Sequence, residues 1–411
     1  MKREYPPHIS FLFVAIMSVG QVAMQTTLPF KVGDLGYGLG ESNLFFSWIS
    51  FCYVVSGFSL GWVSHRFGPR RVMLTTLTIC AVMALAMTGV VEHRQFWQLY
   101  VLATIYLMSI CLFWSSAEHA STGLHGRLTL AQSTAIYCVS FSVGNAVGLL
   151  VSANFQEAQR ASATPFLISV GLTLLVWGLV WLMVSRQSGY HLSPQSAVES
   201  FPETSRARLR RSLFAARIGI VGAYGIYALI LNSLARFLVE QRGFGKPMAG
   251  ALVSLMLVTM ALTFGAHGLW RGWEHRLAWV RVSPFVAALG VAACVTRSAW
   301  MIALGMVVVG IAAGVAYTHN LNYSLEEPGK RARNAGIHEA LVGVAFSLPM
   351  LISGLGARWT NSPVTIFWCG VGMAVVIGLA QNIALFLMRN PKTETENRGG
   401  VPSVETSRRS D

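Results

Sequence analysis

Charged side chains are scarce in this sequence. Asp, Glu, Lys and Arg make up 12% of its 411 residues, whereas 54% of the residues are apolar. Soluble domains carry about 25% charged residues, and one aqueous core could not hide this much apolar surface. The composition therefore excludes an ordinary soluble protein and predicts that lipid surrounds much of the chain.

Several motifs of enzymes and pumps are also missing. The sequence has no G-x-x-x-x-G-K-[ST] phosphate loop and no H-E-x-x-H zinc motif. Its six cysteines lie inside apolar blocks without a C-x-x-C or Cys/His spacing. We therefore expect neither an ATP-driven pump nor an enzyme, and we expect no cofactor and no metal.

The apolar residues fall into blocks of about twenty, the length that a helix needs to cross a bilayer. A helix satisfies its own backbone hydrogen bonds in lipid, so the blocks predict an all-α integral membrane protein. The predicted spans are 9–30, 42–64, 72–91, 96–117, 129–152, 163–185, 213–238, 248–268, 277–296, 299–320, 334–357 and 363–388. The ninth gives the weakest signal because it contains Arg281 and Pro284.

The basic residues that give the chain its formal charge of +14 fall mainly on alternate loops. With a cytoplasmic N-terminus, roughly 23 Lys and Arg lie on the cytoplasmic side and about 7 on the other, as the positive-inside rule requires. Both termini are then cytoplasmic, and the expected location is the cytoplasmic (inner) membrane. Contact with lipid head groups explains these charges better than nucleic acid does.

One long polar segment divides the spans six and six. We expect a six-helix bundle over 1–185, a cytoplasmic linker over 186–212, a second bundle over 213–388 and a disordered cytoplasmic tail over 389–411.

The loop after the second span carries a recognisable pattern. It runs Gly61-Trp62-Val63-Ser64-His65-Arg66-Phe67-Gly68-Pro69-Arg70-Arg71. It resembles the loop signature of the major facilitator superfamily, G-x-L-A/S-D-R/K-F-G-R-R/K-R/K. The resemblance implies twelve helices in two pseudo-symmetric six-helix bundles, with a solute cavity lined by spans 1, 4, 7 and 10.

The same resemblance suggests a conformational latch at Gly61, His65, Arg66, Gly68, Arg70 and Arg71. Glycines permit a tight turn there, and arginines can pair with carboxylates or helix C-termini. His65 stands where the family usually has Asp, which either weakens the latch, makes it sensitive to pH, or has no effect. In the fifth span, Gly144 and Gly148 resemble a motif of the family's exporters, although close helix packing explains them as well.

Polar residues inside spans are costly unless they face a cavity or one another. The candidates for solute binding are Gln21, Gln25, Tyr106, Trp114, Tyr224, Tyr227, Asn232, Arg236, Tyr317 and His319. Arg236 either pairs with an anionic solute group or extends to the outer surface. For the others, hydrogen bonds to neighbouring helices or an interfacial position are the alternatives.

Proton coupling needs a group whose charge can change inside a partly dry site. The spans contain no Asp, which leaves four candidates: Glu118, His119, His338 and Glu339. Glu339 could instead pair with Arg66, Arg70 or Lys330 at the inner surface.

These observations favour a secondary transporter that moves a small solute by alternating access. Proton symport, proton antiport and facilitated diffusion remain open, as do the solute and the oligomeric state, for which a monomer suffices. The alternatives are a proton-driven drug exporter and a transporter-like sensor or scaffold that has lost transport.

Overall fold

The computed structural model describes residues 8–93, 96–122, 128–157, 163–183, 203–274, 276–327 and 330–388. Within these ranges the chain is helical, without a strand. The helices are α1 (His8–Asp34), α2 (Leu39–Phe67), α3 (Pro69–His93), α4 (Phe96–Thr122), α5 (Leu130–Glu157), α6 (Thr164–Met183), α7 (Glu203–Arg242), α8 (Lys246–Leu269), α9 (Leu277–Ala293), α10 (Ala299–Glu326), α11 (Arg331–Thr360) and α12 (Thr365–Leu387), with a short 3-10 turn η1 (Arg271–Trp273). The predicted all-α class with twelve helices is confirmed.

Among the described residues, ten helices are long and apolar enough to cross a membrane. The ninth helix is the shortest of the twelve, at 17 residues, and contains Pro284. Helix α7 is the longest, at 40 residues. It begins at Glu203 rather than near 213, so the last part of the predicted linker is helical. Residues 184–202 of the linker region and the tail 389–411 lie outside the described part of the chain.

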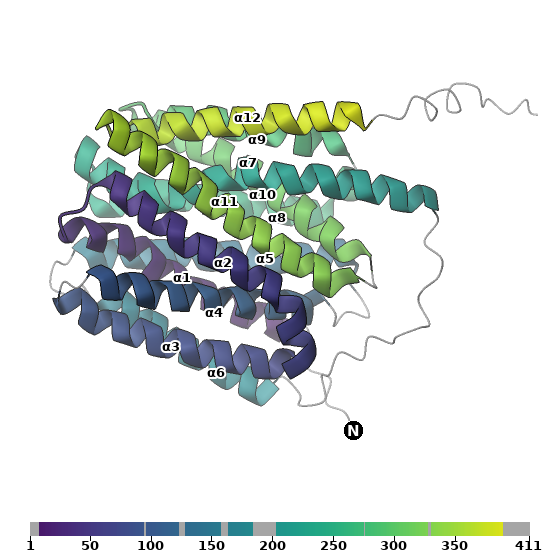
Figure 1. The fold of residues 1–411 in the computed structure, drawn as a ribbon, viewed down its shortest axis with the longest axis horizontal. Coiled ribbons are helices and arrows are strands. Elements are labelled where there is room, and N and C mark those ends of the chain that lie inside the picture. The colour runs from purple at the N-terminus through teal and green to yellow at the C-terminus, as the bar shows by residue number, and fades with distance from the viewer. Residues whose placement is uncertain are drawn as a thin grey trace, which may run out of the picture.

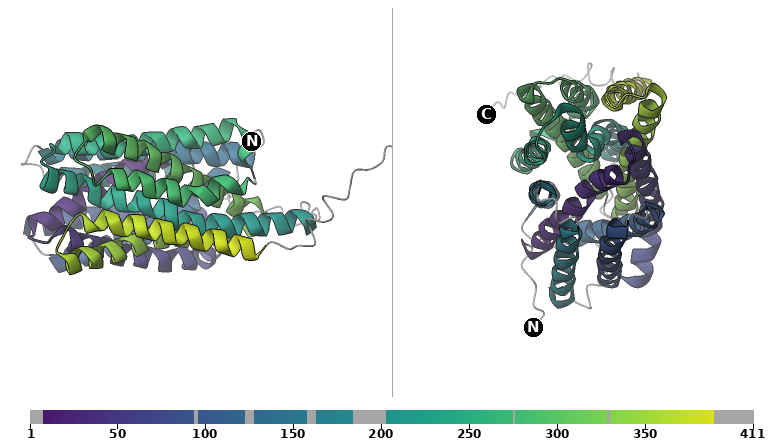
Figure 2. Two further views of the ribbon diagram at one scale, coloured as in Figure 1. Left: turned by 90° about the horizontal axis from the view of Figure 1, so that it is seen from above. Right: turned by 90° about the vertical axis from the view of Figure 1, so that its left-hand side faces the viewer.

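The long helices run side by side along the length of the molecule (Figure 1). Viewed along the bundle, α1–α6 and α7–α12 form two groups (Figure 2, right). Contacts within each group join α1 with α5 and α6, and α7 with α9, α10 and α12. The predicted arrangement of two six-helix bundles is therefore visible in the structure.

Two seams hold the halves together, one between α2 and α11 and one between α5 and α8. Glycines let the backbones approach closely at both. A Cβ atom on Gly57 of α2 would lie 2.8 Å from the backbone nitrogen of Ala340 on α11, and one on Gly250 of α8 would lie 2.5 Å from Cβ of Ala153 on α5. Small residues at such contacts are typical of helices packed in a membrane.

Gly144 and Gly148, by contrast, face α1 within the same half. A Cβ atom on Gly144 would clash with the carbonyl oxygen of Ala15, and one on Gly148 with that of Val19. Close packing accounts for this pair of glycines.

Consecutive helices alternate in direction, so the bundle has two distinct ends. We call the end with the α1–α2 and α7–α8 connections the Arg236 end, and the end with the α2–α3 and α10–α11 connections the Glu118 end. Each name refers to a buried charged side chain near that end.

Candidate functional site

A cavity with about 540 Å³ of space free of protein atoms lies between the halves. Its walls include the four expected helices, α1, α4, α7 and α10, and also α2, α5 and α11. The lining residues are Gln21, Gln25, Ser50, Tyr53, Leu107, Trp114, Tyr137, Phe141, Tyr224, Tyr317, Glu339, Val342, Gly343 and Phe346. Both halves thus contribute to one enclosure that is aromatic over much of its surface.

Two predicted glutamines on α1 lie in this wall and form hydrogen bonds. Trp114 on α4 donates its indole N–H to Oε1 of Gln21 at 2.6 Å. Gln25 donates from Nε2 to Oδ1 of Asn232 on α7 at 3.2 Å. The second bond joins the two halves on the side of the cavity toward the Arg236 end.

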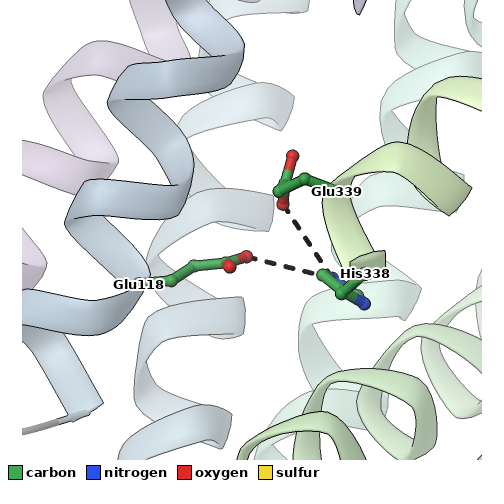
Figure 3. Close-up of side chains that lie close together, drawn as sticks. All are labelled: Glu118, His338 and Glu339. Carbon is green, nitrogen blue, oxygen red and sulfur yellow. Dashed lines mark ion pairs between the residues drawn. The ribbon is translucent and has the colours of Figure 1, made fainter. Parts of the chain in front are cut away.

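Three predicted titratable side chains meet at the other side of the cavity (Figure 3). Glu118 extends from α4 of the first half, and His338 and Glu339 extend from α11 of the second. The His338 Nε2 atom lies 3.9 Å from Oε1 of Glu118 and 4.0 Å from Oε1 of Glu339. All three side chains are buried. We call this group the Glu-His-Glu cluster.

Tyrosines from both halves contact the cluster. Tyr53 on α2 donates its hydroxyl to Oε2 of Glu339. Tyr317 on α10 donates its hydroxyl to Oε1 of Glu118 at 3.4 Å. Each of these bonds joins a residue of one half to a residue of the other. Breaking them is therefore necessary for the halves to separate at the Glu118 end.

The orientation of the imidazole follows from its other nitrogen. Nδ1 of His338 lies 2.8 Å from the Nδ2 amide nitrogen of Asn320 on α10. With the amide nitrogen as donor, Nδ1 accepts this hydrogen bond. The other ring nitrogen, Nε2, faces the two carboxyl groups.

Two carboxylates and an imidazole are also a ligand set found around divalent metals, and one ligand atom from each residue lies within 4.8 Å of the others. The same three groups can also hold and exchange protons, because the charge of each changes on titration.

Arg236 is neither a cavity residue nor an exposed one. Its side chain is 4% exposed. The guanidinium donates to the carbonyl oxygens of Pro29 at 3.0 Å and Tyr37 at 2.7 Å, and to Glu240 at 2.6 Å. The two carbonyls belong to the first half and Arg236 to the second. In this structure Arg236 thus bonds the two halves together at the Arg236 end, and a role in solute binding stays a prediction.

A second polar contact between the halves lies close by. Asn43 on α2 donates to the Ser353 hydroxyl on α11 at 2.9 Å and accepts from Ser233 on α7 at 2.8 Å. Contacts between the halves are therefore present on both sides of the cavity.

Other predicted binding residues lie away from the cavity wall. Tyr106 is buried beside α3, where the Cys80 thiol contacts its carbonyl. Tyr227 stacks on Tyr224 with ring centroids 4.5 Å apart and accepts a hydrogen bond from Asn145. His319 packs among rings that include Trp273, 4.7 Å away. A role in solute binding for these three stays a prediction.

The predicted latch is described only in part. The side chains of His65 and of the proton candidate His119 lie outside the described residues, and nothing beyond its helical backbone is described at Gly61. Gly68 has a φ of +77°, which favours glycine. Arg66 and Arg71 are exposed, and Arg66 lies over the Phe67 ring.

Arg70 contacts the C-terminal turn of α6. Its guanidinium donates to the Trp181 carbonyl at 2.7 Å and lies over the Trp181 ring. This is a helix C-terminus contact of the kind expected for the loop arginines. It lies within the first half, and Glu339 contacts Tyr53 and His338 rather than Arg66, Arg70 or Lys330.

One stretch of the sequence has the spacing of a hydrolase motif, and its position in the fold decides whether it can act as one. Gly57-Phe58-Ser59-Leu60-Gly61 has the G-x-S-x-G spacing of a hydrolase nucleophile elbow, which requires a sharp turn between a strand and a helix. Here the five residues lie inside α2, and Ser59 donates to the Ser56 carbonyl one turn earlier. The spacing therefore does not form a nucleophile elbow.

Sequence reasoning missed several residues that shape the site. Tyr53, Tyr137, Phe141 and Phe346 line the cavity, and Asn320 orients His338. Aromatic residues are common along all the spans, so their identity alone gave no signal. Asn320 was visible as a polar residue near the end of a span, but its partner on α11 was not.

Comparisons with known proteins agree with this architecture. A human organic anion transporter, MFSD10 (TETRAN), is similar in structure with a TM-score of 0.65 and 17% identity, over 91% of this chain and 98% of that chain. The nucleoside transporter NupG gives a TM-score of 0.66 and 12% identity, over 93% and 99%. FucP in its outward conformation gives 0.60 and 14%, over 92% and 98%. At these identities the likeness shows the fold alone.

No curated protein sequence matches the chain. The sequence profile of the Major Facilitator Superfamily, however, matches residues 10–348, most of the chain. This match agrees with the helical architecture, the membrane-spanning lengths and the transporter folds to which the chain is similar. The protein is a multi-pass membrane protein that belongs to the Major Facilitator Superfamily of secondary transporters.

Proposed function

We propose that this protein moves a small solute by alternating access and couples that movement to proton binding at the Glu-His-Glu cluster. The observation that carries the proposal is the position of the cluster. It borders the cavity through Glu339, and it joins the halves through Glu118 on α4 and His338 on α11. A change of protonation there acts on the solute site and on the contact between the halves together.

The physical argument begins with the cost of buried charge. An ionised carboxylate away from water is stable only with a counter-charge or several hydrogen bonds. Protons shared among Glu118, His338 and Glu339 neutralise the cluster and allow the halves to remain in contact. Loss of a proton leaves like charges close together, which favours separation and entry of water at the Glu118 end.

Other titratable groups surround Glu339 and take part in this balance. They are Cys111 on α4, Tyr53 on α2, Tyr137 on α5, Tyr224 on α7 and Tyr317 on α10. A basic group is also near, since Arg217 on α7 donates to Asn334 one turn before His338. The two carboxyl groups and the imidazole are the members of the set whose ordinary pKa values lie below 7.

The contacts at both sides of the cavity support a state between the two open ones. The cluster holds the Glu118 end, and Arg236, with the Asn43–Ser353 contact, holds the Arg236 end. We further propose that the Glu118 end faces the cytoplasm of the cell and that the protein resides in the inner membrane, because the positive-inside rule assigns the basic loops to that side.

The test uses purified protein in liposomes with a pH-sensitive dye trapped inside. A thermal-shift screen of small solutes first identifies a ligand, since ligand binding to the folded state raises its apparent stability. Addition of that ligand should then move protons across the membrane, and an imposed pH gradient should drive its accumulation. The E339Q variant should lose both effects.

The matched control is E327Q, which removes a carboxylate near the same end. Glu327 pairs with Lys330 at 2.7 Å and lies outside the cavity wall. It should retain both effects. Solute movement that is identical with and without a pH gradient in the unchanged protein would refute proton coupling. Absence of any solute movement would favour the sensor or scaffold alternative.

A further inference from the structure

The cavity wall has an aromatic character that bears on the solute. Half of its lining residues are aromatic. The Phe141 ring of one half stacks on the Tyr317 ring of the other with centroids 6.2 Å apart, and the ring centroids of Tyr224 and Tyr317 lie 4.9 Å apart. The face of an aromatic ring carries negative partial charge. A ring that presents its face to a bound solute therefore attracts a cation and repels an anion.

The wall contains one carboxyl group and, among the described residues, no basic side chain. Glu339 is that acid, and no described Lys, Arg or His belongs to the lining. The guanidinium of Arg217 is bonded to Asn334, and that of Arg236 to carbonyls of the first half. An anionic solute in this cavity would lack a counter-ion, which is costly in a buried site.

The Glu339 carboxyl group has capacity for a further donor. Its Oε2 atom accepts from Tyr53, its Oε1 atom lies 4.0 Å from His338 Nε2, beyond hydrogen-bond distance, and the carboxyl group also contacts that of Glu118. An ionised carboxylate accepts about four hydrogen bonds. A proton or an organic cation can each neutralise this group, and the two are alternatives at one carboxyl.

The remaining polarity of the cavity indicates the body of the solute. Besides Glu339, the side chains of Gln21, Gln25 and Ser50 provide polar atoms, and Gln21 already accepts from Trp114. Most of a bound solute would contact rings and aliphatic groups.

We propose that the cavity binds an organic cation with a single positive charge on an aromatic or apolar body, and that Glu339 is its counter-ion. This inference rests on the proposed function, because it takes the cavity as the solute site. The proposed solute is a cation, whereas the human structural neighbour is an organic anion transporter. The likeness to that neighbour shows the fold alone.

The test is equilibrium binding to the full-length detergent-purified protein at pH 8, with probes matched in shape. Benzyltrimethylammonium and tetraphenylphosphonium are the cations, benzyl alcohol is neutral, and benzenesulfonate is the anion. We expect the cations to bind and the other two probes not to. E339Q should weaken cation binding by about tenfold or more, the loss of one buried charge interaction of roughly 1.4 kcal/mol.

Further variants distinguish the loss of the Glu339 charge from a loss of folded protein. F141L removes one ring and leaves Glu339 in place. It should weaken the binding of the cations by about threefold to tenfold, as expected for the loss of one cation–π contact. E327Q should bind like the unchanged protein. Thermal unfolding of each variant verifies that it is folded, and E339D, which retains the charge, should bind better than E339Q.

The outcomes distinguish this inference from the proposed function. Binding of benzenesulfonate or benzyl alcohol without binding of either cation would overturn the inference and leave a solute site in place. Equal cation affinity in E339Q and the unchanged protein would also overturn it. Binding of none of the four probes, together with no ligand in the thermal-shift screen, would remove the solute site and the proposed function with it.

Discussion

Replacing Arg236 by Gln should open the Arg236 end of the bundle. In the structure, the guanidinium donates two hydrogen bonds across the halves, to the carbonyls of Pro29 and Tyr37. A hydrogen bond to a charged group contributes about 1.5–3 kcal/mol, so the closed arrangement should lose about 3–6 kcal/mol. Since 1.4 kcal/mol corresponds to a factor of ten, the equilibrium should shift toward opening by at least about a hundredfold.

The assay measures access to the cavity from the Arg236 end. A cysteine at Ser50, a buried lining residue, is introduced after the six native cysteines are replaced by alanine. Right-side-out membrane vesicles are treated with a membrane-impermeant maleimide. The labelling rate follows the population of the open state when opening is fast. R236Q should therefore label about a hundredfold faster, up to the limit set by a permanently open end.

The matched control is R242Q. Arg242 lies at the end of the same helix and donates to the Val295 carbonyl at 2.8 Å, but both residues belong to the second half. Its loss should leave the labelling rate nearly unchanged.

A second perturbation keeps Arg236 and adds bulk beside it. A Cβ on Gly33 would lie 2.8 Å from the guanidinium carbon, so G33V should also accelerate labelling. Equal rates in R236Q and the parent, or equal acceleration in R242Q, would refute the reasoning.

Three other predictions follow from the contacts between the halves. E118Q should reduce solute accumulation driven by a pH gradient while leaving exchange of labelled for unlabelled solute intact, and loss of both would contradict a coupling role. G57A should lower the free energy of unfolding by about 1–3 kcal/mol because of overpacking, measured by thermal unfolding against G89A, where a Cβ meets no atom within 4 Å. Q25L leaves the buried Asn232 amide without its partner and should lower the free energy of unfolding by about 1–3 kcal/mol. In the double variant with N232L, the free energy of unfolding should fall by less than the sum of the two single losses.

The helices were largely predictable because lipid imposes a simple rule. A span must be long, apolar and helical, and ten of the helices satisfy it over their described residues. The start of α7 was not predictable in this way. Hydropathy reports only the part of a helix that contacts lipid, and the stretch before residue 213 is rich in arginine.

The cluster illustrates what sequence reasoning can and cannot provide. Glu118, His338 and Glu339 were each conspicuous as ionisable groups in or beside apolar spans. Their meeting was not predictable, because it depends on how α4 of one half packs against α11 of the other. The contacts of Arg236 were hidden for a different reason. Its partners are backbone carbonyls, which every residue possesses and which leave no mark in a sequence.

The depth of the cluster gives the transporter an electrical property. The apolar part of α11 spans Arg333–Thr360, and Glu339 lies about 9 Å into it, roughly a fifth of its length, at 1.5 Å per residue. Under the proposed coupling, a proton that arrives from the Arg236 end would cross about four-fifths of the transmembrane voltage before it binds. At about 2.3 kcal/mol per charge per 100 mV, this amounts to about 1.8 kcal/mol for each 100 mV, roughly a twentyfold change in the proton-binding constant of the cluster. Membrane potential alone, at constant pH on both sides, would then change the protonation of this site.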